Sequence, residues 1–352
     1  MIHRKLNTLI WVAFAILAAT ACKKDEEQEA LPSLGGHLSF SVTEFIAPGQ
    51  LLTMTPKGVS HPEGETVGYC WKVTPGMSSY DTTRFANGLS ASGKPSDGTF
   101  SYRFSDSLAT YSVTCYAFAE GYSTTSSSAY VTVVLPGLDG SVKGTGIKMT
   151  DPQIKVDGIT YYYTSHNGLD WFRNNLANTA LGVPYANSPA VSNVLGRFYS
   201  HNEALNACPE GWRLPTDQEW LGLAASINSG SVSEAYNTIP GIAADLMADA
   251  YMNDRKMWEY WPEVGEITNK GLISVIPAGY ANLGEKKEDG SYPTASFYGV
   301  FEYATFWTAE TVAGEDGMAY YRYLICDQPD MYAGKGDVNT FGASVRCVRE
   351  SK

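Results

Sequence analysis

The sequence over residues 207–220 reads Ala-Cys-Pro-Glu-Gly-Trp-Arg-Leu-Pro-Thr-Asp-Gln-Glu-Trp. Thr216 and Glu219 form a capping-box pattern, in which each side chain accepts a backbone N–H from the other residue at the start of a helix. Beyond it, apolar residues recur at helical spacing and fall on one face, namely Trp220, Leu223, Ala224 and Ile227. The stretch therefore predicts an amphipathic helix that begins after Thr216. A second short helix is expected over 242–251.

Composition describes an ordinary globular chain that is acidic. It has 352 residues, of which 44% are hydrophobic and 18% charged, and at about 100–200 residues per domain this length predicts two domains. The net charge of −12 argues against nucleic acid as a partner, because a polyanion binder needs a basic face. Histidine is scarce, at 5 residues, and none has the spacing of a zinc site. We therefore expect no metal cofactor of that class.

The N-terminus has the features of a targeting segment. Residues 1–21 combine a short basic start with an apolar stretch too short to span a bilayer comfortably, which predicts a secretory signal peptide. The end of this segment, Ala-Thr-Ala before Cys22, resembles a bacterial lipobox, in which Cys22 is acylated and becomes the mature N-terminus. Residues 22–36 then form an acidic tether whose first residues resemble the surface-export signal of Bacteroidetes lipoproteins. This resemblance implies an outer-membrane lipoprotein exposed at the cell surface; a plain signal peptide or an uncleaved anchor is the alternative.

Residues 37–135 show period-two segments between turn signals, at about the spacing of an all-β sandwich. The segments around Tyr69–Val73 and Tyr111–Tyr116 resemble strands of immunoglobulin-like and PKD-like domains. Cys70 and Cys115 lie on these two strands, and in a secreted chain we expect them to form a disulfide. A hinge is predicted over 136–144.

Residues 145–352 carry an ordered set of motifs. Besides the quoted stretch these are Val156–Tyr161, Asp170–Leu176, Ile276–Tyr280, Phe306–Glu310 and Ser344–Arg349. Together they resemble the Fibrobacter succinogenes major paralogous domain. The resemblance implies an α+β, C-type-lectin-like domain, with short helices around a twisted and mostly antiparallel sheet. It also implies a disulfide between Cys208 and Cys347.

With these pairs made, Cys326 is left over. Its apolar flank predicts a buried free thiol, and a reactive thiol is the alternative. The stretch after Arg213 also resembles formylglycine-generating enzymes, which share the lectin-like fold and use a pair of active-site cysteines. Here that pair would be Cys326 and Cys347. We do not expect an enzyme, because Cys347 is better explained by a structural disulfide.

Aromatic residues are the candidates for ligand binding. The chain contains 23 Tyr, 13 Phe and 8 Trp, and aromatic rings stack on the apolar faces of sugars. The candidates are Trp258, Trp261, Tyr280 and Trp307, and lesser candidates of the same kind are Asn282, Tyr298, Tyr320 and Tyr321. A place in the core is the alternative for the tryptophans.

A calcium site is a weaker possibility. The tripeptide that begins at Gln328 and ends at Asp330 resembles the calcium-and-sugar motif of calcium-dependent lectins, and Asp337 and Asn339 would complete an oxygen-rich site. A plain turn explains the tripeptide equally.

From these observations we expect a lipid-anchored surface protein that binds glycans through its C-terminal domain. The alternative is a structural or adhesive surface protein that binds another protein or cell. An oxidase of the formylglycine-generating type is the third reading, and it is the one least supported by the residues.

Overall fold

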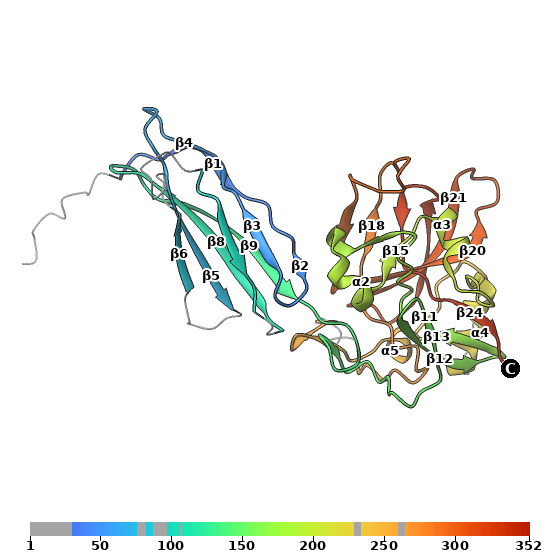
Figure 1. The fold of residues 1–352 in the computed structure, drawn as a ribbon. Coiled ribbons are helices and arrows are strands. Elements are labelled where there is room, and N and C mark those ends of the chain that lie inside the picture. The colour runs from blue at the N-terminus through green and yellow to red at the C-terminus, as the bar shows by residue number, and fades with distance from the viewer. Residues whose placement is uncertain (1–29, 76–81, 87–96, 106–107, 229–233, 260–264) are drawn as a thin grey trace, which may run out of the picture.

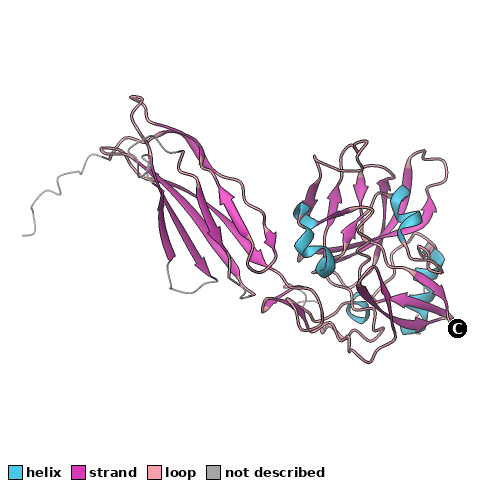
Figure 2. Ribbon diagram, viewed as in Figure 1, coloured by secondary structure: helices cyan, strands magenta, loops and turns pink. Residues whose placement is uncertain are grey.

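The computed structural model describes residues 30–75, 82–86, 97–105, 108–228, 234–259 and 265–352. The predicted signal peptide at 1–21, the lipidation site Cys22, most of the tether and Trp261 lie outside these residues. Figure 1 shows two lobes joined by a short segment, an elongated N-terminal domain and a rounder C-terminal domain. Strands predominate, and every described helix lies in the C-terminal domain (Figure 2). None of the helices in the described ranges is long and apolar enough to cross a membrane.

The N-terminal domain is a β-sandwich. One layer is a five-stranded sheet in the order β2-β9-β8-β5-β6, and the facing strands pair as β1 with β4 and β3 with β7. The strands are β1 (Gly35–Ser39), β2 (Phe45–Ile46), β3 (Leu51–Met54), β4 (Lys57–Ser60), β5 (Gly68–Pro75), β6 (Thr82–Ala86), β7 (Phe100–Arg103), β8 (Thr110–Phe118) and β9 (Thr125–Val133).

Period-two burial explains why these segments form a sandwich. In β5 the side chains of Tyr69, Trp71 and Val73 are buried and their neighbours are more exposed, and β8 alternates in the same way. The buried residues of both layers form one core. Trp71 lies within it and donates from Nε1 to the carbonyl oxygen of Gly98 at 3.0 Å.

The expected disulfide between Cys70 and Cys115 is wrong, since both are free thiols. The register of β5 and β8 gives the reason. Trp71 lies opposite Cys115, whereas Cys70 lies opposite Tyr116. Successive side chains of a strand point to opposite faces, so an offset of one residue places the two thiols on opposite faces of the sheet. Cys115 is buried in the core and Cys70 is half-buried on the outer face.

The segment predicted as a hinge is hydrogen-bonded to both domains. Ser141 donates its backbone N–H to Leu135 O and accepts from Leu135 N–H through Oγ, both at 2.8 Å. Asn253 of the C-terminal domain donates its backbone N–H to Ser141 O at 2.9 Å, and its Nδ2 donates to Val133 O of the sandwich at 2.7 Å. A Cβ on Gly140 would lie 2.1 Å from Leu135 O, so this turn requires glycine. The segment is therefore a bonded joint.

A second contact across the joint comes from β2. The Phe45 ring packs edge-on against Tyr185 with ring centroids 5.7 Å apart, and Ser188 Oγ donates to Phe45 O. Phe45 and Val134 belong to a core cluster of the C-terminal domain. Apolar burial thus adds to the hydrogen bonds that connect the two domains.

The C-terminal domain is built from small sheets in the orders β10-β16-β17, β11-β12-β13-β24, β14-β15, β19-β18-β23 and β20-β21-β22. Its strands are β10 (Val142–Lys143), β11 (Gln153–Val156), β12 (Ile159–His166), β13 (Leu169–Phe172), β14 (Val183–Pro184), β15 (Arg197–Phe198), β16 (Tyr251–Met252), β17 (Arg255–Lys256), β18 (Tyr280–Asn282), β19 (Ser296–Tyr298), β20 (Tyr303–Thr311), β21 (Met318–Ile325), β22 (Tyr332–Asp337), β23 (Phe341–Gly342) and β24 (Val348–Glu350).

Short helices lie between these strands. They are the 3₁₀ helix η1 (Tyr185–Asn187), α2 (Pro189–Leu195), α3 (His201–Ala207), α4 (Asp217–Ile227) and α5 (Ala243–Leu246). The capping box of α4 is confirmed, because Thr216 accepts from the N–H of Glu219 and Glu219 accepts from the N–H of Thr216. The predicted apolar face of α4 is buried. An equivalent capping box at Ser200 and Glu203 begins α3, which the sequence analysis missed.

The predicted helix over 242–251 is wrong in its length. Helix α5 ends at Leu246, and Met247 is already extended. The reason is a competing backbone partner, because Ala248 N–H donates to Val275 O at 2.9 Å and Met247 forms a bridge with Val275. Strand-like pairing thus replaces the second helical turn.

A buried ion pair joins α4 to β21. Arg322 donates from Nε and Nη2 to the two carboxylate oxygens of Asp217 at 2.7 and 2.8 Å, and the side chains are 0% and 1% exposed. Asp217 also accepts from the Tyr236 N–H at 2.7 Å. A buried ion pair adds little to the free energy of unfolding when compared with well-packed apolar residues of similar volume. Removal of one partner, however, leaves the other charge buried without a counter-charge, which is strongly destabilising.

We therefore expect Asp217→Asn to lower the free energy of unfolding of the C-terminal domain by about 3 kcal/mol or more. Urea unfolding followed by tryptophan fluorescence measures the change. Asp316→Asn, at an exposed position of the same domain, is the matched control and should change it by less than about 0.5 kcal/mol. Equal stability of the two variants would show that the ion pair is dispensable.

Candidate functional site

Two of the candidate tryptophans are core residues, which corrects their predicted role. Trp258 is fully buried and donates from Nε1 to Val275 O at 3.2 Å. Trp307 is also fully buried and donates from Nε1 to Tyr199 O at 2.7 Å. Neither ring can reach a ligand on the surface. Trp261 lies outside the described residues.

The candidate calcium ligands do not come together. Gln328 and Asp330 precede β22, whereas Asp337 ends this strand and Asn339 follows it, so the two pairs lie at opposite ends of β22. Their oxygens also have other partners: Asp330 accepts from Gly241 N–H at 2.8 Å, and Asp337 accepts from the N–H groups of Asn339 and Thr340, both at 2.9 Å. The four residues therefore form two local turns. Across the described ranges, no cluster of three or more His, Cys, Asp or Glu side chains could hold a metal ion.

The cysteines of this domain are structural or buried. Cys208 and Cys347 form the disulfide that the resemblance implies, with an S–S distance of 2.08 Å. Cys326 is free, buried and part of the core around Trp220 and Phe306. Burial, with nearby negative charges, raises the pKa of the Cys326 thiol to about 11. Cys326 and Cys347 do not form a pair of free thiols in this structure, because Cys347 is bonded to Cys208.

Tyr280 is the candidate that the structure places on an accessible surface. Its ring stacks on Tyr298 at 5.5 Å and on Phe341 at 5.9 Å, and meets Tyr303 edge-on at 5.7 Å. Tyr298 is 46% exposed. Strands β19, β18 and β23 form one sheet in that order, and Tyr303 begins β20 of another sheet. A bridge between Gly279 and Ala304 brings the two sheets together here.

The row of rings continues onto β21 and β22. Phe341 stacks on Tyr321 with centroids 4.6 Å apart, Tyr321 contacts Tyr323 at 5.7 Å, and Tyr323 stacks on Tyr332 at 5.3 Å. We call this row the aromatic surface; each of its rings is partly exposed. It consists of Tyr280, Tyr298, Tyr303, Tyr321, Tyr323, Tyr332 and Phe341.

Strand geometry explains how the rings are positioned. Side chains alternate along β21, so Tyr321 and Tyr323 share one face while Arg322 and Leu324 point into the core. Gly334 lies opposite Tyr321 in the register, and a Cβ there would come within 2.4 Å of Tyr321 Cζ. The ring therefore lies against bare backbone, which fixes its orientation.

Carboxylates lie beside one end of the aromatic surface. Glu302, Asp327 and Asp330, which we call the acidic edge, act electrostatically on Tyr303 and Tyr332. Burial raises the pKa of both tyrosines, and these negative charges raise it further. The phenols therefore stay protonated at neutral pH as hydrogen-bond donors. The arrangement offers ring faces, hydroxyl donors and carboxylate acceptors on one surface.

Sequence reasoning missed Tyr303, Tyr323, Tyr332 and Phe341 as members of this surface. The spacing of Tyr321 and Tyr323 was a usable signal, since two residues apart on a strand means the same face.

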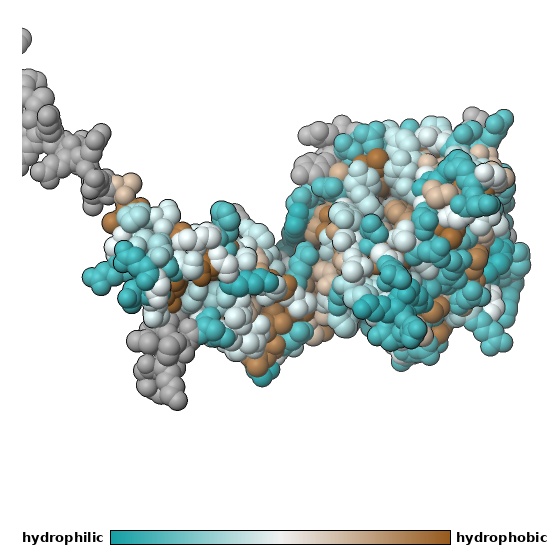
Figure 3. All heavy atoms as spheres, turned by 90° about the horizontal axis from the view of Figure 1, so that it is seen from above, coloured by the Kyte–Doolittle hydropathy of each residue, from teal (hydrophilic) through white to brown (hydrophobic). Residues whose placement is uncertain are grey.

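Figure 3 shows that apolar residues are scattered over the visible face of the C-terminal domain between polar ones. A tyrosine surface of this kind is half polar, so hydropathy alone does not mark it.

Comparison with known proteins gives one match along the sequence of the C-terminal domain. Residues 164–349 match the Fibrobacter succinogenes major domain. No curated protein matches the chain. Among solved structures, the chicken CNTN1 FN1-FN3 domains are similar at 12% identity and a TM-score of 0.21, over 40% of this chain. The chain covers 47% of the length of that structure.

The state of Cys326 makes a direct test of the enzyme hypothesis. With its pKa raised to about 11, the thiol is almost entirely protonated at pH 8, and only thiolate reacts. We expect iodoacetamide at pH 8 to modify Cys326 only after unfolding, and to modify the half-buried Cys70 first, as read by peptide mass spectrometry. Cys326→Ser should leave native-state labelling unchanged. Rapid labelling of Cys326 in the folded protein would instead support a reactive thiol.

Proposed function

The chain belongs to the family of the Fibrobacter succinogenes major domain, and from this we propose that it is a lipid-anchored surface protein that binds glycans through the aromatic surface. The observation that carries the proposal is the row of partly exposed rings from Tyr298 to Tyr332. Rings that stack with one another and keep one side accessible can also stack on the apolar faces of sugar rings. The acidic edge supplies acceptors for sugar hydroxyls.

We assign binding without catalysis to this surface. Its phenols have raised pKa values, which suits them to donate hydrogen bonds and makes them poor bases at neutral pH. We also propose that binding is independent of calcium, because Asp330 and Asp337 lie at opposite ends of β22. The negative charges of the acidic edge disfavour nucleic acid as a partner.

For the C-terminal domain we propose a C-type-lectin-like fold. Short helices surround small, mostly antiparallel sheets. The disulfide between Cys208 and Cys347 connects residues 139 positions apart, and it joins the end of α3 to the residue before the last strand, β24. These features support the assignment.

For the location we propose the outer membrane, with the chain anchored by acylated Cys22 and facing the outside. The sandwich then lies between the anchor and the binding domain. Its bonded joint to the C-terminal domain, through Ser141 and Asn253, suits a spacer that carries the binding domain away from the membrane. Two acyl chains give stable anchoring without any spanning helix.

The glycan proposal predicts the effect of removing single rings. The full chain is screened on a glycan array with and without calcium, and each hit is titrated against Tyr298→Ala and Tyr323→Ala. Each change removes a stacking ring worth about 1 kcal/mol, so we expect the affinity to fall about fivefold to tenfold. The affinity should be the same with and without calcium.

Tyr236→Ala is the matched control. Tyr236 is 36% exposed and stacks on Tyr320 at 3.8 Å, but Tyr320 points to the opposite face of β21 from Tyr321. The control should bind like the unchanged chain. Hits that survive both ring removals, or that need calcium, would place the site elsewhere. An array without hits, together with binding to a protein ligand that Tyr298→Ala abolishes, would favour the adhesive alternative.

The anchor is tested by Cys22→Ala in the cell of origin or a host that lipidates secreted proteins. We expect the chain to move from the membrane fraction to the soluble fraction, because the acyl chains that would hold it at the membrane are lost. Fractionation with detection by antibody measures the shift. Unchanged partitioning would show that the anchor is not at Cys22.

A further inference from the structure

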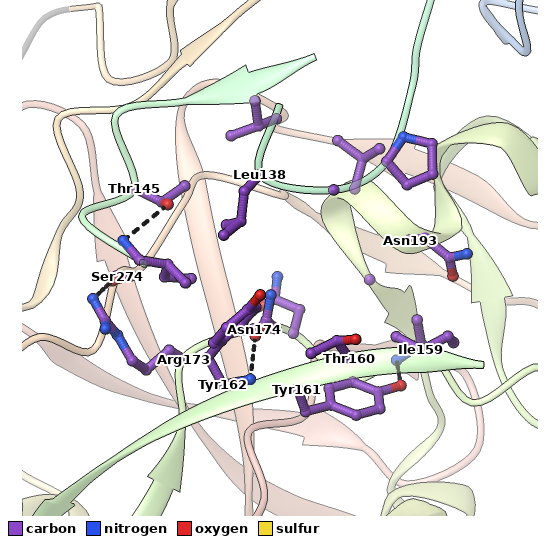
Figure 4. A pocket seen from close by; sticks show the side chains of 18 of the residues that line it. Leu138, Thr145, Ile159, Thr160, Tyr161, Tyr162, Arg173, Asn174, Asn193 and Ser274 are labelled. Atoms are coloured by element: carbon purple, nitrogen blue, oxygen red, sulfur yellow. Dashed lines mark hydrogen bonds between the residues drawn. The ribbon is translucent and has the colours of Figure 1, made fainter. Parts of the chain in front are cut away.

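A cavity of about 330 Å³ lies between the joint and the C-terminal domain. Leu138 of the joint lies on one side, and Thr160 and Tyr162 of β12 lie on the other (Figure 4). Leu135 also lines the cavity. This volume is at the small end of the range for ligand pockets, about 300–1,000 Å³. The cavity is separate from the aromatic surface, with which it shares no residue.

Two buried arginines line the cavity. Arg346 is 1% exposed, and its donors reach only uncharged oxygens, among them Asn175 Oδ1 at 2.7 Å and Ile273 O at 2.8 Å. Burial, together with the charge of Arg173, lowers the pKa of Arg346 to about 9, so it remains a cation at neutral pH. A buried charge without a counter-charge is costly.

Arg173 shares the cavity and leaves one donor unused. It is 3% exposed and pairs with Asp151 through Nη1 at 2.5 Å, while Nη2 donates to Ser274 Oγ at 2.9 Å and to Gly146 O at 3.0 Å. Its Nε is buried and donates to no atom of the described chain. Asp151 thus compensates one of two positive charges, and no Asp or Glu is among the residues that line the cavity.

The geometry points to a binding site for a small hydroxylated carboxylate of the hexuronate class. Its carboxylate would supply, from the cavity side, the counter-charge that the buried guanidinium groups of Arg173 and Arg346 lack. Its hydroxyls would meet polar groups such as Thr160 and Asn174, and the apolar side of its ring would lie against Leu138, as the placement of these three residues in Figure 4 allows. This inference does not depend on the aromatic surface binding glycans.

Isothermal titration of the full chain tests the proposal with three probes: sodium D-glucuronate, methyl β-D-glucuronide and D-glucose. We expect glucuronate to bind at least tenfold more tightly than glucose, because glucose lacks the charge. Binding of the methyl glucuronide as well would assign the site to the end of a glycan chain, and binding of glucuronate alone would assign it to the free acid. Either result supports the carboxylate site.

Two variants locate the binding in the cavity. Arg173→Lys keeps a positive charge but replaces the planar guanidinium by a compact ammonium group, and we expect about a tenfold weaker affinity for glucuronate. Asn193→Trp places a large ring at the exposed residue of α2 that lines the cavity, and it should abolish binding without disturbing the core. Asn206→Trp, exposed on α3, is the control and should bind normally. Failure of glucuronate to bind, equal binding of glucose, or unchanged affinity in Asn193→Trp would overturn the inference.

Discussion

The C-terminal domain depends on the docking of its last strand against the segment between α3 and α4. Val348 and Arg213 exchange two backbone hydrogen bonds, at 2.8 and 2.9 Å, and the neighbouring Cys347 is bonded to Cys208. On its other side β24 pairs with β13. Closing a loop of 139 residues removes entropy from the unfolded chain, worth about 4–5 kcal/mol in the chain-entropy description. A domain of many short strands and short helices needs such a long-range cross-link, because short strands and helices are only marginally stable by themselves.

The same strand connects the core with the cavity at the joint. Arg346 precedes Cys347 and extends its guanidinium to Phe172 O and Ile273 O, at 3.0 and 2.8 Å. These hydrogen bonds connect β13 with the segment after α5. The same arginine also lines the cavity. The joint closes this cavity from the other side, since Leu135 and Leu138 form its wall. A ligand in this cavity would contact both Arg346, next to β24, and the joint at Leu135 and Leu138. Binding of a ligand and stiffness of the joint would therefore be coupled.

Local signals in the sequence predicted local structure well. The Thr216 capping box and the buried face of α4 were correct because residues three and four apart interact within the helix itself. The pairing of Cys70 with Cys115 failed because register depends on the partner strand. Trp258 and Trp307 failed as ligand contacts because burial is decided by distant segments, Val275 and Tyr199, that accept their indole N–H groups. Tyr280, Tyr298 and Tyr321 were named in advance as single candidates, but the aromatic surface as a whole was not predicted, because its rings come from separate strands.

The rigidity of the aromatic surface bears on how it would bind. Its rings stand on paired strands, and Tyr321 lies against the backbone of Gly334, so few rotamers remain to be fixed when a ligand arrives. Ordering a free side chain on binding costs about 0.5–1.5 kcal/mol. Single sugar–ring contacts are worth no more than this, so they yield net affinity only where the rings are already ordered. A row of pre-ordered tyrosines is therefore better suited to weak, extended ligands than a flexible loop that carries the same residues.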